Sequence, residues 1–126
     1  MTKPLISVVL PTHNRVSLLE KAIHSVLRQT EKDFELIIVD DASTDQTSEF
    51  LNQFVENDTR ITVIKNIVAL GGGGARNVGI YASKAKWIAF LDDDDEWVEN
   101  KLSCLLYTSD AADDLLCVDL GGRRII

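Results

Sequence analysis

The chain alternates four short apolar runs with longer segments in which apolar residues recur every three or four positions. The runs lie at residues 5–10, 34–39, 61–64 and 87–91, and the first three are rich in β-branched residues. This pattern is typical of strands that are buried on both faces of a sheet. The segments between the runs are predicted to be amphipathic helices. The third helix follows the glycine run 71–74, and the first is the clearest, with apolar positions Val16, Leu19, Ala22, Ile23, Val26 and Leu27.

Element boundaries are predicted from residues that start or stop regular structure. Pro11 is expected to stop the first strand, because proline cannot donate to a ladder. Ser17 with Glu20 three residues later fits a capping box at the start of the first helix, and Asn14 is the alternative cap. Ser43, three residues before a glutamine, predicts the start of the second helix in the same way.

The order β-α-β-α-β-α-β predicts an α/β fold with a Rossmann-like, doubly wound and mainly parallel sheet. In such sheets, ligands bind beyond the carboxyl ends of the strands. Three polar clusters follow predicted strands: "PTHNR" after the first, "DDASTD" after the second and "DDDDE" after the fourth. We therefore expect these clusters to meet in one site.

The run of four aspartates, residues 92–95, needs a positive partner or full solvation. Two ionised acids roughly 7 Å apart on one face of a strand repel by about 0.6 kcal/mol in water and about 2.4 kcal/mol at an effective dielectric of 20. Asp92 and Asp94 would form a D-x-D pair of hard oxygen ligands, which suits Mg²⁺ or Mn²⁺ bound together with substrate phosphates. The alternative is a solvated acidic turn or a helix N-terminus, where acids are favoured.

Other phosphate and metal motifs do not fit. An EF-hand counted from Asp92 would place Trp97 where glycine is required, and the glycine run is neither a P-loop nor a dinucleotide fingerprint. Arg76, just after that run, could meet a diphosphate or lie on the surface. His13 could line the site, but no nucleophile triad is indicated.

Composition narrows the function classes. With 126 residues the chain forms one domain at most, and 45% hydrophobic residues suffice for a core. The formal charge of −7 argues against nucleic-acid binding. We expect no membrane-spanning segment in this chain and no secretion signal, and hence the cytoplasm, or the cytoplasmic face of a membrane in the intact protein. The two cysteines are not expected to form a disulfide framework.

Six segments, in order and at consistent spacing, resemble the family 2 glycosyltransferases with the GT-A fold. They are "ISVVLPTHNR", "SVLRQT", "FELIIVDDASTD", "GGARNVGI", "WIAFLDDDDEW" and "NKL", and together they cover about residues 4–102. The resemblance implies a nucleotide-sugar donor, most often a UDP-sugar, held with Mn²⁺ or Mg²⁺. It also implies an unidentified saccharide or lipid-linked acceptor.

The resemblance assigns roles to individual residues. Pro11 and Thr12 wall the nucleoside, Asp41 contacts the uracil, Asp92 lies near the ribose and Asp94 binds the metal. The implied donor-binding set is Pro11, Thr12, Asn14, Asp41, Arg76, Asn77, Asp92 and Asp93, and the implied metal ligands are Asp94 and Asp92. The usual mechanism is inverting: a general base deprotonates the acceptor hydroxyl, which displaces the nucleoside diphosphate.

The sequence departs from the family after "ENKLS". The family's general base lies well beyond the D-x-D motif, and about thirty residues follow Asp94 here. We expect this chain to lack the base and to be inactive alone. In the tail, "CLLYTSDA" and "VDLGGRRII" resemble translated sequencing adapters. Residues 1–103 are therefore predicted to be the donor-binding part of a truncated domain, and 104–126 a non-native tail.

Two other function classes remain as alternatives. A nucleotidyltransferase shares the sheet and uses acids with Mg²⁺, but typically has a glycine-rich loop directly after the first strand, where this chain has "PTHNR". A non-catalytic nucleotide- or metal-binding module, such as a receiver domain, also clusters acids at strand ends. It needs a single phosphorylatable aspartate and a later lysine.

Overall fold

The computed structural model describes residues 3–111 and 124–126. Its elements from β1 to β4 follow the predicted order, and α4 and β5 were not predicted. Strands and helices alternate along the chain: β1 Ile6–Thr12, α1 Val16–Leu27, β2 Phe34–Asp41, α2 Thr47–Asn57, β3 Ile61–Asn66, α3 Gly71–Ala82, β4 Trp87–Phe90, α4 Lys101–Ala111 and β5 Arg124–Ile125. The predicted α/β, Rossmann-like fold is confirmed.

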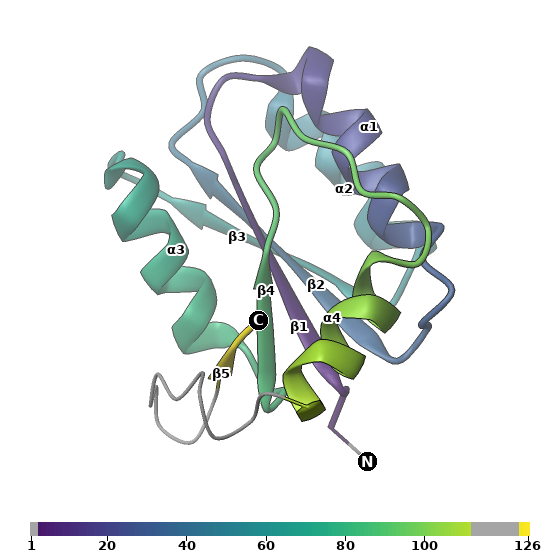
Figure 1. Ribbon diagram of the computed structural model, residues 1–126. Helices are drawn as coiled ribbons and strands as arrows, with labels where there is room; N and C mark the ends of the chain where they lie inside the picture. The colour runs from purple at the N-terminus through teal and green to yellow at the C-terminus, as the bar shows by residue number, and fades with distance from the viewer. Residues whose placement is uncertain (1–2, 112–123) are drawn as a thin grey trace.

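The five strands form one parallel sheet in the order β3-β2-β1-β4-β5. β1 lies at the centre and pairs with β2 from Ile6 opposite Phe34 to Thr12 opposite Asp40. From β1 the chain winds outward through β2 to β3, then returns to place β4 on the other side of β1. The winding therefore reverses between β1 and β4, which is where this class of sheet opens a ligand crevice. The chain leaves β1, β2 and β4 at the same end of the sheet (Figure 1).

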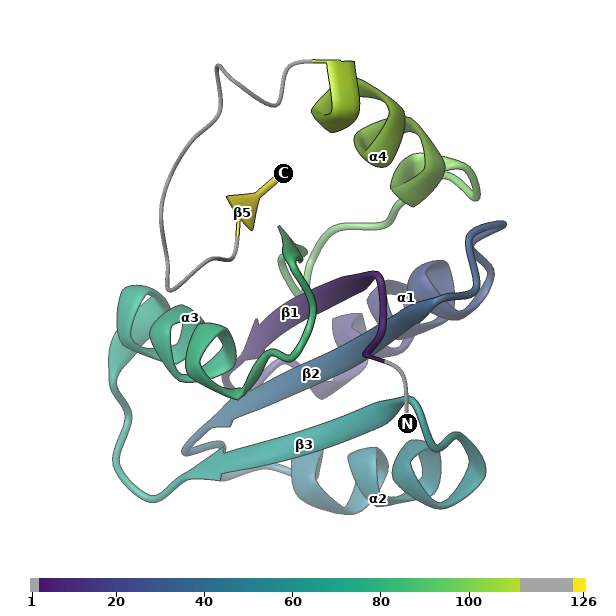
Figure 2. The same cartoon turned by 90° about the horizontal axis from the view of Figure 1, so that it is seen from below.

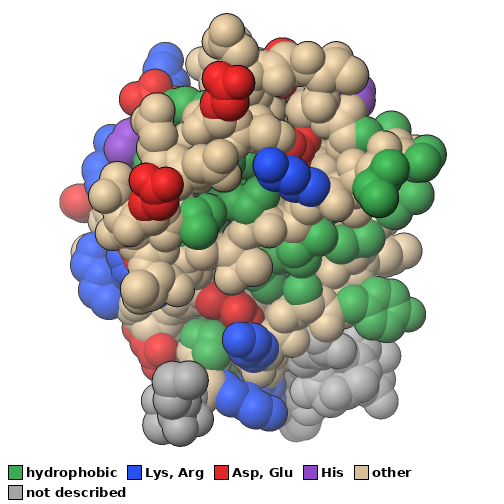
Figure 3. All heavy atoms as spheres, turned by 180° about the vertical axis from the view of Figure 1, so that it is seen from behind, with side chains coloured by type: hydrophobic (Ala, Val, Ile, Leu, Met, Phe, Trp, Pro, Cys, Tyr) green, Lys and Arg blue, Asp and Glu red, His purple; other side chains and the backbone are tan. Residues whose placement is uncertain are grey.

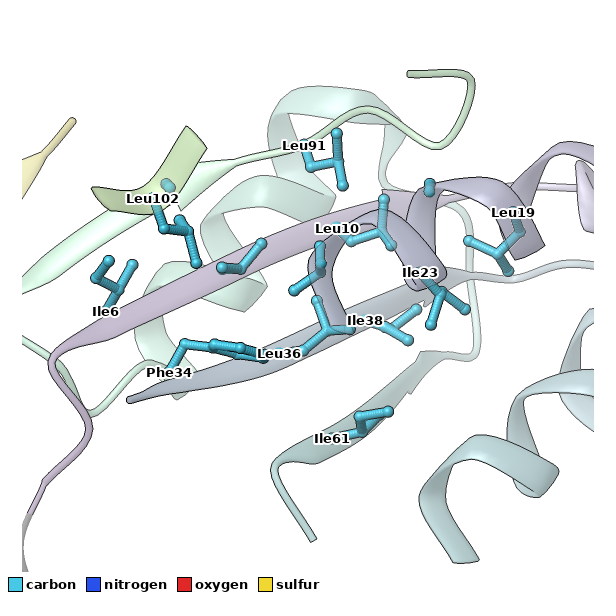
Figure 4. Close-up of a cluster of buried hydrophobic side chains, with 14 of the residues drawn as sticks. Ile6, Leu10, Leu19, Ile23, Phe34, Leu36, Ile38, Ile61, Leu91 and Leu102 are labelled. Carbon is cyan, nitrogen blue, oxygen red and sulfur yellow. The ribbon is translucent and has the colours of Figure 1, made fainter. Parts of the chain in front are cut away.

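Helices cover both faces of the sheet (Figures 1 and 2). Alternate residues of β2 point to opposite faces: Leu36 and Ile38 join the larger core, and Ile37 and Val39 the smaller. The larger core packs α1, α2 and α4 against one face of the sheet (Figure 4). Its fully buried residues include Ile6, Leu10, Leu19, Ile23, Leu36, Ile38, Leu51, Leu91 and Leu102. Among the described elements, α3 covers the opposite face through Ala75, Val78 and Ala82.

The first strand does not stop at Pro11, as the sequence predicts, but continues to Thr12. The carbonyl of Val9 accepts a hydrogen bond from the Leu91 amide, so residue 9 faces β4. Pro11, two residues on, faces the same side, beyond the last β1–β4 pair at Val9 opposite Phe90. Proline at position 11 therefore costs the sheet no hydrogen bond, because β4 has no paired residue opposite it.

The predicted helix starts are wrong. α1 begins at Val16 and α2 at Thr47, and neither has a side-chain cap from its own N-cap residue. Asp45 caps both helices instead: its Oδ2 accepts a hydrogen bond from the Val16 amide at 3.5 Å, and its Oδ1 accepts one from the Thr47 amide at 3.0 Å. Ser17 lies inside the first turn of α1, and Ser43 donates its amide to Asp40 four residues before α2. The glycine run expected before the third helix instead forms its first turn.

Apolar side chains remain exposed over α3 and the turn before it (Figure 3). Ile67 is 97% exposed, Val68 69% and Tyr81 84%. Within residues 3–111 and 124–126, no helix has the length and apolar character needed to cross a membrane. Cys104 is a free, exposed thiol, while Cys117 and most of the predicted tail lie outside the described residues.

Candidate functional site

A cleft of about 430 Å³ opens at the carboxyl ends of β1, β2 and β4. Its walls come from all three polar clusters singled out in the sequence, together with the start of α3. The lining residues are Pro11, Thr12, His13, Arg15, Asp41, Gly72, Ala75, Arg76, Asp92, Asp93 and Asp94. The expectation that the clusters meet in one site therefore holds in the structure.

The acidic turn after β4 presents its aspartates in two different environments. Asp92 and Asp94 are exposed, with side chains 60% and 53% accessible, whereas the side chain of Asp93 is only 10% accessible. Asp93 accepts a hydrogen bond of 2.9 Å from the hydroxyl of Thr12, which is itself buried. This bond fixes the acidic turn to the end of β1, so the two outer carboxylates point from an anchored backbone.

Two arginines provide the positive charge that the run of acids requires. Arg76, from α3, approaches Asp92 with its Nη2 3.1 Å from Oδ1. Arg15, from the loop after β1, places Nη1 3.2 Å from Asp94 Oδ2 and 3.5 Å from Asp93 Oδ1. Arg15 is not among the site residues expected from the sequence. The sequence feature that could have identified Arg15 is its position in "PTHNR". There a cationic residue follows the first strand, and the acids 92–95 follow the fourth strand, at the same end of the sheet.

Asp41 is a buried carboxylate at the end of β2 whose oxygens receive three N–H donors. Oδ1 accepts from the Asn66 side chain at 2.9 Å and the Leu70 amide at 2.8 Å, and Oδ2 accepts from the Gly71 amide at 2.9 Å. Gly71 adopts φ +78°, a conformation that suits glycine, at the start of α3. Burial alone would raise the pKa of Asp41, but these hydrogen bonds outweigh it and hold the pKa below its ordinary value.

His13 and Asn14 join the loops after β1 and β2. The His13 Nδ1–H donates to the carbonyl of Asp41 at 2.6 Å, which leaves Nε2 facing the Asn14 amide at 3.3 Å. The side-chain oxygen of Asn14 accepts from the amides of Thr44 and Asp45 at 2.7 and 3.2 Å. Asn14 has φ 53°, which asparagine tolerates better than most residues. The two loops are thus held together behind the cleft.

Most of the residues proposed from the sequence line the cleft, and two do not. Those that line it are Pro11, Thr12, Asp41, Arg76, Asp92, Asp93 and Asp94. Asn14 binds the neighbouring loop instead, and Asn77 is exposed on α3 away from the lining.

A family model described as Glycosyl transferase family 2 matches residues 7–123. The chain belongs to glycosyl transferase family 2. The resemblance noted in the sequence is therefore correct, and the sheet with its cleft is the corresponding part of a GT-A fold.

Relatives of this chain include curated proteins and solved structures. WcaA of Escherichia coli K12, named as a colanic acid biosynthesis glycosyl transferase, is 48% identical over 82% of this chain and 37% of its own length. The Escherichia coli UDP-Glc:alpha-D-GlcNAc-diphosphoundecaprenol beta-1,3-glucosyltransferase WfaP is 41% identical over 79% of this chain and 39% of its own length. The structure of S. aureus TarS 1–349 in complex with UDP-GlcNAc superposes with a TM-score of 0.78 at 27% identity, over 86% of this chain and 32% of that one. The chain thus spans about two fifths of the length of these two curated relatives.

The acidic turn fits the divalent cation that the family resemblance implies. Asp92 and Asp94 present exposed carboxylates to one cleft, and Mg²⁺ or Mn²⁺ usually binds one or two such groups plus phosphate oxygens. In the part of the chain that the structure describes, no group of three or more His, Cys, Asp or Glu side chains is arranged to hold a metal ion. Two exposed carboxylates in one cleft are a donor set that suits a cation which also binds phosphate oxygens.

Proposed function

We propose that this chain forms the donor-binding part of an inverting glycosyltransferase that uses a nucleotide-diphospho-sugar, a UDP-sugar, with Mn²⁺ or Mg²⁺. The observation that carries the proposal is the cleft itself. A buried acceptor, Asp41, lies in the same cleft as two exposed carboxylates, Asp92 and Asp94, at the point where the winding of the sheet reverses. Membership of glycosyl transferase family 2 supports the interpretation of this cleft as a nucleotide-sugar site.

Asp41 is proposed to bind the base. An ionised carboxylate has about four acceptor positions, and three at Asp41 are filled by N–H donors. The remaining position on Oδ2 can accept from the N3–H of uracil. Because its pKa is lowered, Asp41 remains an acceptor at neutral pH. A nucleobase with an acceptor atom instead of an N–H group at this position would have no hydrogen-bond donor to pair with at Asp41. Pro11 and Thr12 are proposed to wall the nucleoside beside it.

Asp92 and Asp94 are proposed to hold the metal, with Asp92 also near the ribose. The lining has four carboxylates and two arginines, a formal charge of −2. A diphosphate that enters this cleft meets like charge unless a divalent cation enters with it. Such a cation, when bound, stabilises the charge that develops on the departing nucleoside diphosphate.

The acceptor is proposed to be a saccharide hydroxyl. WfaP is named for a diphosphoundecaprenol-linked acceptor, which supports a lipid-linked sugar here too and a site of action at the cytoplasmic face of a membrane. The proposal for this chain concerns donor binding, because the chain spans about two fifths of such relatives.

UDP binding with and without Mn²⁺ tests the proposal, measured by isothermal titration calorimetry. We expect binding with Mn²⁺ and none in EDTA. Asp94→Asn should strongly weaken Mn²⁺-dependent binding, because it removes the negative charge of a metal ligand. Asp95→Asn is the matched control: it makes the same charge change one residue later, on an exposed side chain outside the cleft lining. Equal, metal-independent binding by wild type and Asp94→Asn would refute the proposal.

A further inference from the structure

We propose that Arg15 exchanges partners when the donor binds, leaving Asp94 to the metal and moving to the diphosphate. This inference rests on the proposed function. It assigns Arg15, which the sequence pattern did not single out, a role in donor binding. It also predicts that Arg15 opposes metal binding when no nucleotide is present.

The contacts of Arg15 suit a side chain that can leave its partners. Its guanidinium lies 3.2 Å from one oxygen of Asp94 and 3.5 Å from one oxygen of Asp93, and it donates a hydrogen bond to Asp94 through Nη1. The Arg15 side chain is 50% exposed, and exposed ion pairs of this kind contribute little to stability. Its backbone, in contrast, is fixed, because the Arg15 carbonyl accepts from the amides of Leu18 and Leu19 at the start of α1.

The two aspartates that contact Arg15 differ in how firmly the protein holds them. Asp93 is buried and bound to Thr12, so it stays in place as an anchor. Asp94 is 53% exposed, and Arg15 is the cation that the structure places on it. A divalent cation that binds Asp94 repels the guanidinium at the same oxygens. Asp94 therefore cannot serve both cations well.

The diphosphate supplies a new partner for the displaced guanidinium. Arginine matches phosphate oxygens in a fork geometry, and charge-assisted hydrogen bonds of this type are among the stronger polar contacts. Arg15 already lines the cleft together with Arg76 and the acidic turn. A movement of the side chain alone, around a fixed backbone, is enough for the exchange.

The exchange predicts effects of opposite sign in one variant. In Arg15→Gln, Mn²⁺ without nucleotide should bind about two- to fivefold more tightly, because the competing cation is gone. UDP at saturating Mn²⁺ should bind about tenfold more weakly, because a phosphate contact is lost. Electron paramagnetic resonance of free Mn²⁺ measures the first affinity, and calorimetry the second.

Arg28→Gln is the matched control. Arg28 forms a similarly exposed ion pair, 3.5 Å from Glu96, and does not line the cleft. Arg28→Gln makes the same change in net charge as Arg15→Gln. Because Arg28 lies outside the cleft, the variant should change neither the Mn²⁺ affinity nor the UDP affinity appreciably. Arg15→Lys retains the charge and should restore both affinities most of the way toward wild type.

The outcomes separate this inference from the proposed function. If the wild-type chain binds no UDP with Mn²⁺, both are wrong. If the wild type binds UDP but Arg15→Gln moves both affinities in one direction, or neither, only the partner exchange is wrong. Should Arg15→Gln fail to fold, the wild-type Arg15 Nε–H signal in NMR decides. It should shift on addition of Mg²⁺ and again with UDP, and a signal that stays fixed through both additions overturns the exchange.

Discussion

At the residue scale, Asp41 combines two roles that are usually separate. Its carboxylate receives the amides of Leu70 and Gly71 at the start of α3, where a negative charge also complements the helix dipole. The same carboxylate lines the cleft. The acid at the end of one strand thus fixes the next wall of the site.

Asp41→Asn should lower the free energy of unfolding by about 1–3 kcal/mol at neutral pH, because an amide offers one acceptor atom to donors that now use both oxygens. The pKa of Asp41 is lower in the folded chain than its ordinary value of 3.8. The unfolded chain therefore binds the proton at higher pH, so the contribution of Asp41 is present above about pH 4 and is lost as the pH falls through the folded pKa.

Urea unfolding between pH 7 and pH 3 measures both effects, and the variant should lose less stability on acidification than wild type. Asp33→Asn is the control, since it makes the same charge change on an exposed side chain. Identical acid sensitivity in Asp41→Asn and wild type would contradict the assignment.

Thr12→Val tests the anchor of the acidic turn. Valine has nearly the same shape but cannot donate, so Asp93 would keep a buried oxygen without its hydrogen bond. We expect a loss of about 1–3 kcal/mol in unfolding free energy. Thr12→Ser, which retains the hydroxyl, should lose less, and equal losses in the two variants would show that the bond has no such role.

At the scale of elements, α3 lies directly on β1 at Gly79. A Cβ atom built on Gly79 would come 2.3 Å from Cγ1 of Val9, closer than real contacts allow. The approach brings the N-terminal half of α3, with Arg76, to the end of the sheet where the acids lie. The position of one wall of the cleft therefore depends on a residue that does not line it.

Gly79→Ala should destabilise the fold by about 1–3 kcal/mol through overpacking, measured by chemical denaturation. Gly73→Ala is the contrasting variant: its added Cβ meets nothing within 4 Å, so it should stabilise α3 by about 0.5–1 kcal/mol. Combining Gly79→Ala with Val9→Ala should recover part of the loss, because the two sites are in contact. Strict additivity would argue against this packing.

At the scale of the whole molecule, all the described residues that line the cleft lie between Pro11 and Asp94. α4 and β5 follow that stretch and stabilise the sheet from outside it. β5 pairs with β4, and Ile126 packs against the larger core. Stability and donor binding should therefore be separable at the C-terminal end of the chain.

A chain that ends at residue 111 should test this separation. We expect it to lose about 1–2 kcal/mol of unfolding free energy, because β5 and the contact of Ile126 are removed. Its Mn²⁺-dependent affinity for UDP should remain unchanged within the error of calorimetry. Loss of UDP binding in a chain that still unfolds cooperatively would contradict the division at residue 103 that we propose.

The sequence by itself determined the order of the elements from β1 to β4, their parallel pairing and the end of the sheet where the site lies, whereas α4 and β5 were not predicted from it. These follow from hydrophobic periodicity and from the rule for parallel crossovers, both of which act over short stretches of chain. Asp41, Arg76, Asp92 and Asp94 could be placed in the site for the same reason, since each follows a strand or begins a helix.

Only the tertiary structure decided which groups meet within that site. Thr12 and Asp93 are 81 positions apart, Arg15 and Asp94 are 79 apart, and Asp45 caps a helix that begins 29 positions before it. The local capping signal at Ser17 was overridden by Asp45, a residue far along the chain, because a hydrogen bond depends on distance in space. No periodicity in the sequence records that distance.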